Sequence, residues 1–514
     1  MWIAFISWLL VYTILLTIIA QLIKSFSAVQ KFSVLDLAFV PLTAISAERL
    51  PVQAESVGEV EYIEKRIFKE DNFGGFEKLL YDYEWDKIYT MDCSIDEQFS
   101  HFLEKIKFFF DMAFPKKRIR VRKNATPEWL TPEIKESRRK LKLLYKDAKE
   151  LGVSSLRNSF KIEKKKYKRT IREAQRSCYT RKIETSSNKV KGAWNVVNSM
   201  RRSKNKDVGC LEVLVEDRVV KNPQRICDIF NNFFVNVSTT TLKGVAPNLF
   251  DGISVPNDHL TIEELGIDDI EKAISDLKNK STSGDDEISL GLISRFSSFF
   301  LPHLHRFFNG FLQQSLFPPA LKISRIKPLF KGGDPKLVTN YRPIALTSAF
   351  SKIFEKVLAT RITEFLEEKN LLHASQFGYR QNRSTADAIN HTVEIIVQAL
   401  EKGWSTVAVF LDLSKAFDKV DFSILLSILA HLRFGNPLIR LIHSFLYGRQ
   451  QYVFLVQNGK EYRSSFRSPT CSVPQGSILG PLLFLLYINW LPILAGIEDV
   501  CMFCDDTVMG KTPN

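Results

Sequence analysis

Cysteine is scarce in this sequence. Seven scattered cysteines in 514 residues, an odd number, do not form a disulfide framework, so we expect a reducing compartment. Cys501 and Cys504 are a lone pair on a predicted strand with no second ligand pair nearby, which disfavours a zinc or redox role. Internal repeats and low-complexity tracts are missing too, which excludes a repeat architecture.

Acidic residues are depleted in one block. The net charge is +14, and residues 116–206 hold about thirty basic against about eight acidic residues. Thr131-Pro132-Glu133 is typical of a helix start, and residues 134–185 lack proline, which predicts one or two long cationic helices. A solvated helical surface is the alternative, but too few acids are present to pair these charges, which favours nucleic-acid binding. The candidate binding residues are Lys116, Lys117, Arg118, Arg138, Arg139, Lys164, Lys165 and Lys166.

Residues 1–23 form a long hydrophobic run without any charge. The run is long enough to span a bilayer, and Trp2 and Trp8 fit an interfacial anchor, so a transmembrane segment at residues 2–23 is one interpretation. A cleaved signal peptide is disfavoured because the basic n-region is missing and the apolar region is too long. A stretch joined to the rest by a gene-model error or an insertion is the other open interpretation.

Two adjacent carboxylates, Asp505 and Asp506, stand between two runs of strand-forming residues. This pattern predicts a β-hairpin with a charged turn. Two carboxylates about 5 Å apart repel by about 3 kcal/mol at an effective dielectric constant near 20, so the pair faces open water or holds a cation. Asp-Asp pairs also occur at 268–269 and 285–286, so the dipeptide alone does not identify a site.

A third carboxylate, Asp412, follows the apolar run 407–411, which predicts a buried strand. At the end of such a strand Asp412 projects from the sheet edge, where a hairpin can bring Asp505 beside it. The alternative for Asp412 alone is a helix N-cap.

Two further segments suit phosphate chemistry. Residues 326–334 and 340–344 predict two strands joined by a glycine-rich turn, which brings Lys331 and Arg342 towards one place. Arginine can fork two phosphate oxygens and lysine supplies a point charge, so the pair suits a triphosphate, with Lys327 as the alternative lysine. Glycines flank a polar stretch at 474–481, which allows a ligand to approach the backbone closely.

These residues together describe a metal-dependent nucleotidyl transferase. Three carboxylates can hold two Mg²⁺ ions roughly 3.5–4 Å apart, with Mn²⁺ as a substitute. One ion activates an incoming 3′-hydroxyl and the other bridges the triphosphate as pyrophosphate leaves.

The order of these motifs resembles the reverse transcriptase domain of non-LTR, LINE-type, Jockey-like retrotransposons. The resemblance is carried by NYRPI at 340–344, QFGYRQNRST at 376–385, FLDLSKAFD at 410–418, VPQGSILGPLLF at 473–484 and FCDD at 503–506. Upstream, STSGDD, FNNFF and WLTPEIK resemble the region between endonuclease and polymerase in such proteins. The similarity covers most of the chain after about residue 65, with specificity falling towards the N-terminus.

The resemblance implies a role for each matching residue. Asp412 and Asp505 would ligate the metals with Asp506 in support, and Leu411 would lend its backbone carbonyl. The ring of Phe417 would block a ribose 2′-hydroxyl and so select deoxynucleotides. Lys331 and Arg342 would hold the triphosphate, and Gln475 and Gly476 would line the template and nucleotide face. The implied partners are an RNA template, a DNA primer and deoxynucleoside triphosphates.

The implied fold is α+β. We expect the fingers and palm of a right-hand polymerase, with an antiparallel palm sheet covered by helices on one face, preceded by a mostly helical basic region. The thumb would follow residue 510 and is expected to be missing. We divide the chain into a hydrophobic N-terminal segment (1–45), a basic helical linker region (46–207), an N-terminal extension with fingers helices (208–324) and a reverse transcriptase domain (325–514).

Some positions depart from the family pattern. Ser472 stands where the family usually has glycine, which predicts strain in a turn that requires positive φ. Trp490 stands where aspartate is usual, and Cys504 where alanine is usual. No apurinic-type endonuclease signature precedes the polymerase region.

Two functions remain open at this point. The first is an RNA-directed DNA polymerase acting in the nucleus or cytoplasm as part of the element's ribonucleoprotein. The second is a degenerate, inactive nucleic-acid-binding remnant of such an element. A membrane location would follow only from a genuine N-terminal segment.

Overall fold

The computed structural model divides into two units, each described by itself below. The described residues are 62–120, 127–186, 188–202, 212–216, 218–236, 258–277, 282–413, 415–457, 460–496 and 499–511. The smaller unit contains residues 59–63 and 118–211, and the larger unit combines residues 64–117 with the chain from 212 onwards.

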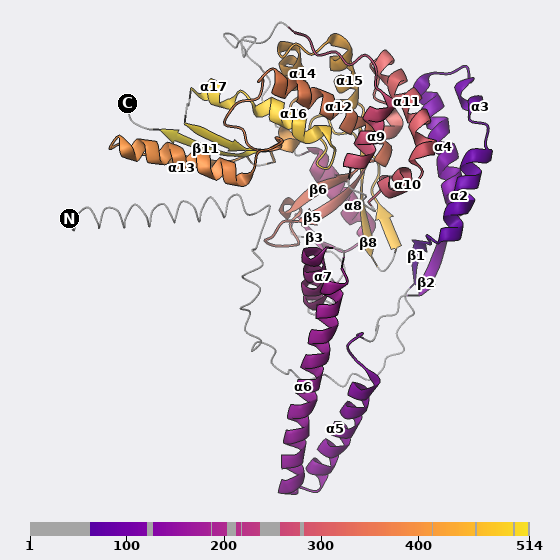
Figure 1. Cartoon of the computed structure of the whole chain (residues 1–514), viewed down its shortest axis with the longest axis vertical. Helices are drawn as coiled ribbons and strands as arrows, with labels where there is room; N and C mark the ends of the chain where they lie inside the picture. Colours follow the sequence, from indigo (N-terminus) through magenta and orange to yellow (C-terminus); the bar gives the residue numbers. More distant parts are fainter. Residues whose placement is uncertain are drawn as a thin grey trace. The chain divides into compact units, whose positions relative to one another are not determined.

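The smaller unit is helical and cationic. It contains α5 (Pro132–Glu150), α6 (Ser154–Glu184) and α7 (Lys189–Arg202), with α5 packed along α6 (Figure 1). The predicted helix start is confirmed, because the side chain of Thr131 accepts a hydrogen bond from the backbone N–H of Ile134 and Pro132 is the first helical residue. The two long cationic helices predicted from residues 134–185 are therefore present.

The larger unit begins with an aromatic helical layer. Its helices are α2 (Glu70–Asp82), α3 (Asp86–Tyr89) and α4 (Ile95–Ala113). The larger unit also holds most of β1 (Tyr62–Arg66) and the start of β2 (Lys116–Arg120). Ser94 and Glu97 form a capping box at the start of α4. Helix α4 packs on α2 and α11, with phenylalanines filling the space between them.

The larger unit contains a four-stranded sheet in the order β6-β5-β8-β9. Its strands are β5 (Ile323–Phe330), β6 (Tyr341–Leu346), β8 (Gln450–Gln457) and β9 (Lys460–Arg463). Strands β5 and β6 pair antiparallel as predicted for the two cationic segments, whereas β5 and β8 run parallel. Helix α8 (Pro223–Asn236) packs on β8, and β3 (Val213–Val215) pairs with β4 (Arg218–Val220).

Helices supply most of the core of the larger unit. They are α9 (Ile267–Asp276), α10 (Leu290–Arg295), α11 (Ser297–Gln314), α12 (Ala349–Glu368), α14 (Phe422–His431), α15 (Asn436–Leu446), α16 (Leu479–Ile488) and α17 (Leu491–Ala495). Helices α10 and α11 are separated at Phe296, whose φ of −111° and ψ of 33° are not helical.

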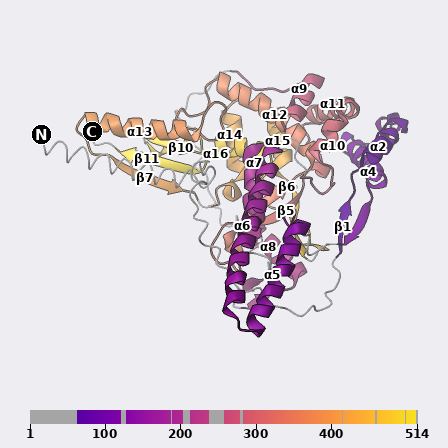
Figure 2. The same cartoon turned by 60° about the horizontal axis from the view of Figure 1, so that its bottom comes forward.

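A three-stranded antiparallel sheet in the order β10-β11-β7 carries the carboxylates. It consists of β7 (Val407–Asp412), β10 (Val500–Phe503) and β11 (Asp506–Lys511), and α13 (Thr385–Glu401) runs along it in both views (Figures 1 and 2). The expectation that 407–411 is a buried strand is wrong. Val407 is 64% and Val409 51% exposed, because β7 is an edge strand among the described residues.

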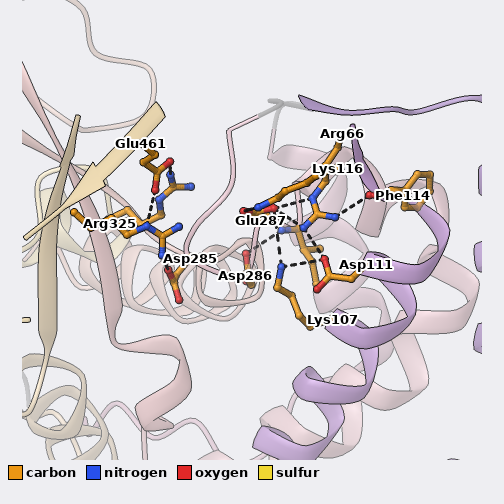
Figure 3. A network of polar contacts seen from close by, with 12 residues as sticks. Arg66, Lys107, Asp111, Phe114, Lys116, Asp285, Asp286, Glu287, Arg325 and Glu461 are labelled. Carbon is orange, nitrogen blue, oxygen red and sulfur yellow. Dashed lines mark hydrogen bonds and ion pairs between the residues drawn. The ribbon is translucent and has the colours of Figure 1, made fainter. Parts of the chain in front are cut away.

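A polar network joins the segment 284–287 to neighbouring elements of the larger unit (Figure 3). The carboxylate of Glu287 accepts a hydrogen bond from Nε of Arg66 at 2.7 Å and another from Nζ of Lys116 at 2.6 Å. Asp286 accepts a hydrogen bond from the hydroxyl of Ser348, which caps α12. On the other side Arg325 donates to Glu461 at 2.9 Å and to the carbonyl of Gly284 at 3.3 Å. The network therefore ties the base of the β5–β6 hairpin and the start of α12 to the aromatic layer.

The transmembrane prediction is corrected. Within the described ranges, no helix combines the length and the apolar character that a bilayer crossing requires. The predicted segment at residues 2–23 lies outside the described residues.

Candidate active site

The hairpin predicted around the Asp505-Asp506 pair is present. Phe503 pairs with Asp506 across the β10–β11 ladder, so Cys504 and Asp505 form the turn and Asp506 begins β11. Cys504 has φ of 61°, a left-handed conformation that L-residues adopt at a cost. The two carboxylates therefore differ in position: one belongs to the turn and the other to a strand.

Strand β7 brings the third carboxylate to the hairpin. In the antiparallel ladder between β7 and β11, Asp412 is the partner of Asp506 and Leu411 is the partner of Thr507. Directly opposed residues of an antiparallel pair lie on the same face of the sheet. The structure thus brings together Asp412, Asp505 and Asp506, which are separated by more than ninety residues in sequence.

The three carboxylates repel one another. Burial and the neighbouring charge of Asp412 raise the pKa of Asp505, although Arg342 and Lys331 oppose the rise. Burial together with Asp505 and Asp412 raises the pKa of Asp506 to about 6. Concentrated negative charge of this kind favours a bound cation.

The predicted cations lie within electrostatic reach of the carboxylates. Arg342 is on β6, and Lys331 follows β5, where its backbone N–H donates to the carbonyl of Asn340 at 2.9 Å. Burial and Arg342 lower the pKa of Lys331, while Asp418 and Asp412 act in the opposite direction. Lys331 and Arg342 thus lie near one another as predicted, and the positive charge of each lowers the pKa of Asp505.

Phe417 stands beside the hairpin at the start of a short 3₁₀ turn. Its ring stacks on Phe484 of α16 with centroids 4.6 Å apart, and Tyr379 meets it edge-on at 6.3 Å. The backbone carbonyl of Phe417 accepts a hydrogen bond from the N–H of Val473. These contacts hold the ring from two sides.

Gln475 and Gly476 sit against β6. The carbonyl of Gln475 accepts a hydrogen bond from the N–H of Ala345 at 2.8 Å. Gly476 has φ of 126°, and a Cβ there would lie 2.4 Å from the carbonyl oxygen of Ala345, so only glycine fits. The strain predicted at Ser472 is confirmed by its φ of 92°.

Asp418 is a site residue that the sequence analysis did not single out. The side-chain amide of Gln475 donates to its carboxylate at 3.2 Å, and burial raises the pKa of Asp418. Asp418 also borders a small cavity beside Gln475 that is lined by Arg449 and Ser324. The available signal was its place as the last residue of the FLDLSKAFD motif.

The donor atoms at the hairpin suit a hard divalent cation. Mg²⁺ takes oxygen ligands and is commonly held by one or two carboxylates together with substrate phosphates. Asp412, Asp505 and the carbonyl of Leu411 offer such oxygens. Among the residues that the structure describes, no group of three or more His, Cys, Asp or Glu side chains is placed to hold a metal ion by itself.

The predicted nucleic-acid-binding residues fall in both units. Arg138 and Arg139 are exposed on α5, and Lys164, Lys165 and Lys166 are exposed on α6. Lys116 differs, because its ammonium group pairs with Glu287 at 2.6 Å. Lys117 and Arg118 continue the same strand, β2.

Aromatic and apolar side chains accompany the cations of the smaller unit. Tyr145 and Phe160 place their rings 5.2 Å apart between α5 and α6, and Lys164 lies over the ring of Phe160. Leu151 and Ile162 are 68% and 67% exposed. A cationic surface with exposed rings can contact both phosphates and bases.

Comparison with known proteins places these features in a family. Residues 331–512 match the family model described as reverse transcriptase (RNA-dependent DNA polymerase). A solved structure of apo telomerase from Candida tropicalis, truncated from its C-terminal domain, shares 15% identity and covers 38% of this chain and 44% of its own. Its TM-score of 0.28 carries no weight in the assignment.

Two relatives from Drosophila melanogaster are more similar in sequence. The probable RNA-directed DNA polymerase from transposon BS is 32% identical over 45% of this chain and 25% of its own length. The RNA-directed DNA polymerase from mobile element jockey is 29% identical over 50% of this chain and 28% of its own length. The chain thus spans about a quarter of the length of these relatives. Residues 331–512 are therefore similar to the reverse transcriptases of mobile elements.

Proposed function

We propose that this chain is an RNA-directed DNA polymerase of a non-LTR retrotransposon that extends a DNA primer by two-metal nucleotidyl transfer. The observation that carries the proposal is the ladder that sets Asp412 opposite Asp506, with Asp505 in the adjoining turn. A conserved fold alone does not imply activity, so the geometry of these carboxylates is what supports the reaction.

Asp412, Asp505 and the carbonyl of Leu411 would hold the metal ions, with Asp506 adding negative charge beside them. Bound Mg²⁺ would supply charge that lowers the pKa of the primer 3′-hydroxyl and offsets the charge of the leaving pyrophosphate. Without metal the carboxylates repel one another, which is reflected in the raised pKa of Asp505 and Asp506. Cation binding relieves that repulsion.

The surrounding residues bind and orient the substrates. Lys331 and Arg342 pair with triphosphate oxygens, Arg342 through two parallel hydrogen bonds and Lys331 as a point charge. Gln475, held by Asp418 at 3.2 Å, presents its amide beside the nucleotide. The ring of Phe417, stacked on Phe484, occupies the space that a ribose 2′-hydroxyl needs.

The cationic helices of the smaller unit bind the RNA template. Lys164, Lys165 and Lys166 are consecutive in the sequence of α6, and all three are exposed. Charges that are not neutralised within the protein release counterions from the nucleic acid when they bind it.

The test is primer extension by the Asp412→Asn variant. The substitution keeps the size of the side chain but removes a metal-binding charge, so we expect extension on an RNA template to fall below detection while RNA affinity stays unchanged. Asp92→Asn, at an exposed position outside the site, is the matched control and keeps full extension. Extension by Asp412→Asn within tenfold of the wild type would reject the metal assignment.

A further inference from the structure

The segment Ser375–Tyr379 lies along the free edge of β10, next to the carboxylate turn. The N–H of Met502 donates to the carbonyl of Ser375 at 2.9 Å, and the N–H of Phe377 donates to the carbonyl of Met502 at 2.8 Å. Gln376 and Met502 form an isolated parallel bridge. The segment therefore extends the sheet beyond β10 by one short strand-like piece.

The side chain of Gln376 reaches from this segment to the turn. It is fully buried, and its Oε1 accepts hydrogen bonds from the N–H of Gly378 at 2.8 Å and of Cys504 at 3.2 Å. Two donors face the same atom, so that atom must be the amide oxygen and the amide cannot flip. Cys504 is the left-handed residue that directly precedes Asp505. A buried acceptor thus satisfies the backbone at the point where the turn leaves ordinary geometry.

Gly378 sets how closely the segment approaches the turn. A Cβ at this position would lie 2.3 Å from the backbone nitrogen of Cys504 and 2.4 Å from its Sγ. Any larger residue would therefore push the turn away from Gln376.

The amide nitrogen of Gln376 shows that only the oxygen of this side chain has a hydrogen-bonding role among the described residues. Its Nε2 is buried and has no hydrogen-bond partner among the described residues. An unpaired buried donor is costly, and an apolar side chain of the same length would avoid that cost. The acceptor oxygen at Cys504 is the contact that an apolar residue cannot replace.

We propose that Gln376 is a positioning residue of the active site: its buried side-chain carbonyl fixes the backbone of Cys504 and so holds Asp505 beside Asp412. The inference rests on the proposed polymerase function and adds a residue that acts through the metal-binding turn. Its loss displaces a carboxylate and weakens metal binding, whereas RNA binding is unaffected.

The experiment measures Mn²⁺ binding to the full chain by electron paramagnetic resonance titration, with primer extension in parallel. Gln376→Met removes the acceptor, and Gln376→Asn keeps an amide but withdraws it from Cys504. Both variants should bind Mn²⁺ about 10–100-fold more weakly and lose extension by a similar factor, with unchanged RNA affinity. Gln381→Met, five residues further on at an exposed position, is the control and should match the wild type.

The outcomes separate this inference from the proposed function. A folded Gln376→Asn variant with wild-type Mn²⁺ affinity overturns the positioning role, even if Gln376→Met fails to fold. A wild-type chain that binds Mn²⁺ but does not extend a primer rejects the polymerase function, and the Mn²⁺ affinities of the variants still decide the role of Gln376. A wild-type chain that binds no Mn²⁺ rejects both.

Discussion

At the residue scale, the chemistry depends on where individual carboxylates stand in the ladder. Asp412 and Asp506 are register partners, whereas Asp505 lies in the turn that Cys504 opens with a positive φ. A slip of one residue in the β7–β11 register would move Asp412 to the opposite face. In the proposed polymerase, the hydrogen bonds that position this hairpin would therefore determine where the carboxylates stand.

In the proposed polymerase, the choice between ribose and deoxyribose would belong to one residue, Phe417. Its ring is held against Phe484, so truncation to valine opens space without moving the metal ligands. We expect Phe417→Val to raise the use of ribonucleotides relative to deoxynucleotides by about ten- to hundredfold. Competitive incorporation of the two nucleotide types measures this ratio. Phe466→Val, at a 54% exposed position, serves as the control, and an unchanged ratio in Phe417→Val would reject the steric role.

At the element scale, the segment 284–287 connects layers that are distant in sequence. Burial raises the pKa of Glu287, but hydrogen bonds and charge from Lys116 and Arg66 outweigh burial and hold it at about 2 (Figure 3). A carboxylate whose pKa is depressed in the folded state stabilises the fold above its unfolded pKa of about 4.3. That contribution is lost as the pH falls from about 4.5 towards 2.

Glu287→Gln tests this contribution. At pH 7 we expect the variant to lose about 2 kcal/mol of unfolding free energy, because Arg66 and Lys116 lose a charged acceptor. The difference from the wild type should shrink as the pH falls below about 4.5. Urea unfolding of both proteins between pH 7 and pH 3 measures the difference. A constant difference across this range would contradict the ion-pair account.

In the proposed function, the helices α5 and α6 would supply the electrostatic contribution to RNA binding. Replacing Lys164, Lys165 and Lys166 by glutamine should reduce the slope of log affinity against log salt by about 2, since each lost contact to single-stranded RNA changes it by about 0.7. Filter binding at several salt concentrations measures the slope. The control replaces three exposed lysines of the larger unit, Lys65, Lys69 and Lys78. An equal change in both triple variants would mean that only the net charge matters.

At the scale of the whole molecule, the sequence predicted local elements better than their surroundings. The charged hairpin and the Thr131 helix cap follow from short patterns of turn formers and capping residues, and both are confirmed. The prediction that residues 407–411 are buried was wrong. The exposure of a strand depends on which strands and helices cover its sheet, and an apolar run alone does not specify that.

The candidate site was predictable where residues belong to motifs. Asp412, Asp505, Lys331 and Arg342 were all singled out as candidates from spacing and chemistry, and the structure brings their charges close together. Asp418 was missed because its role depends on a tertiary contact with Gln475, 57 residues further along the chain. Gln376 was visible only as part of a motif, since its contact to Cys504 spans 128 residues.

We propose that the carboxylates of the hairpin and of β7 hold the metals of a polymerase. The decisive experiment is single-turnover incorporation of one deoxynucleotide onto an RNA-templated DNA primer, with Mg²⁺ and the full chain. We expect incorporation by the wild type and none detectable by Asp505→Asn at equal RNA affinity. Incorporation by Asp505→Asn within tenfold of the wild-type rate would contradict it.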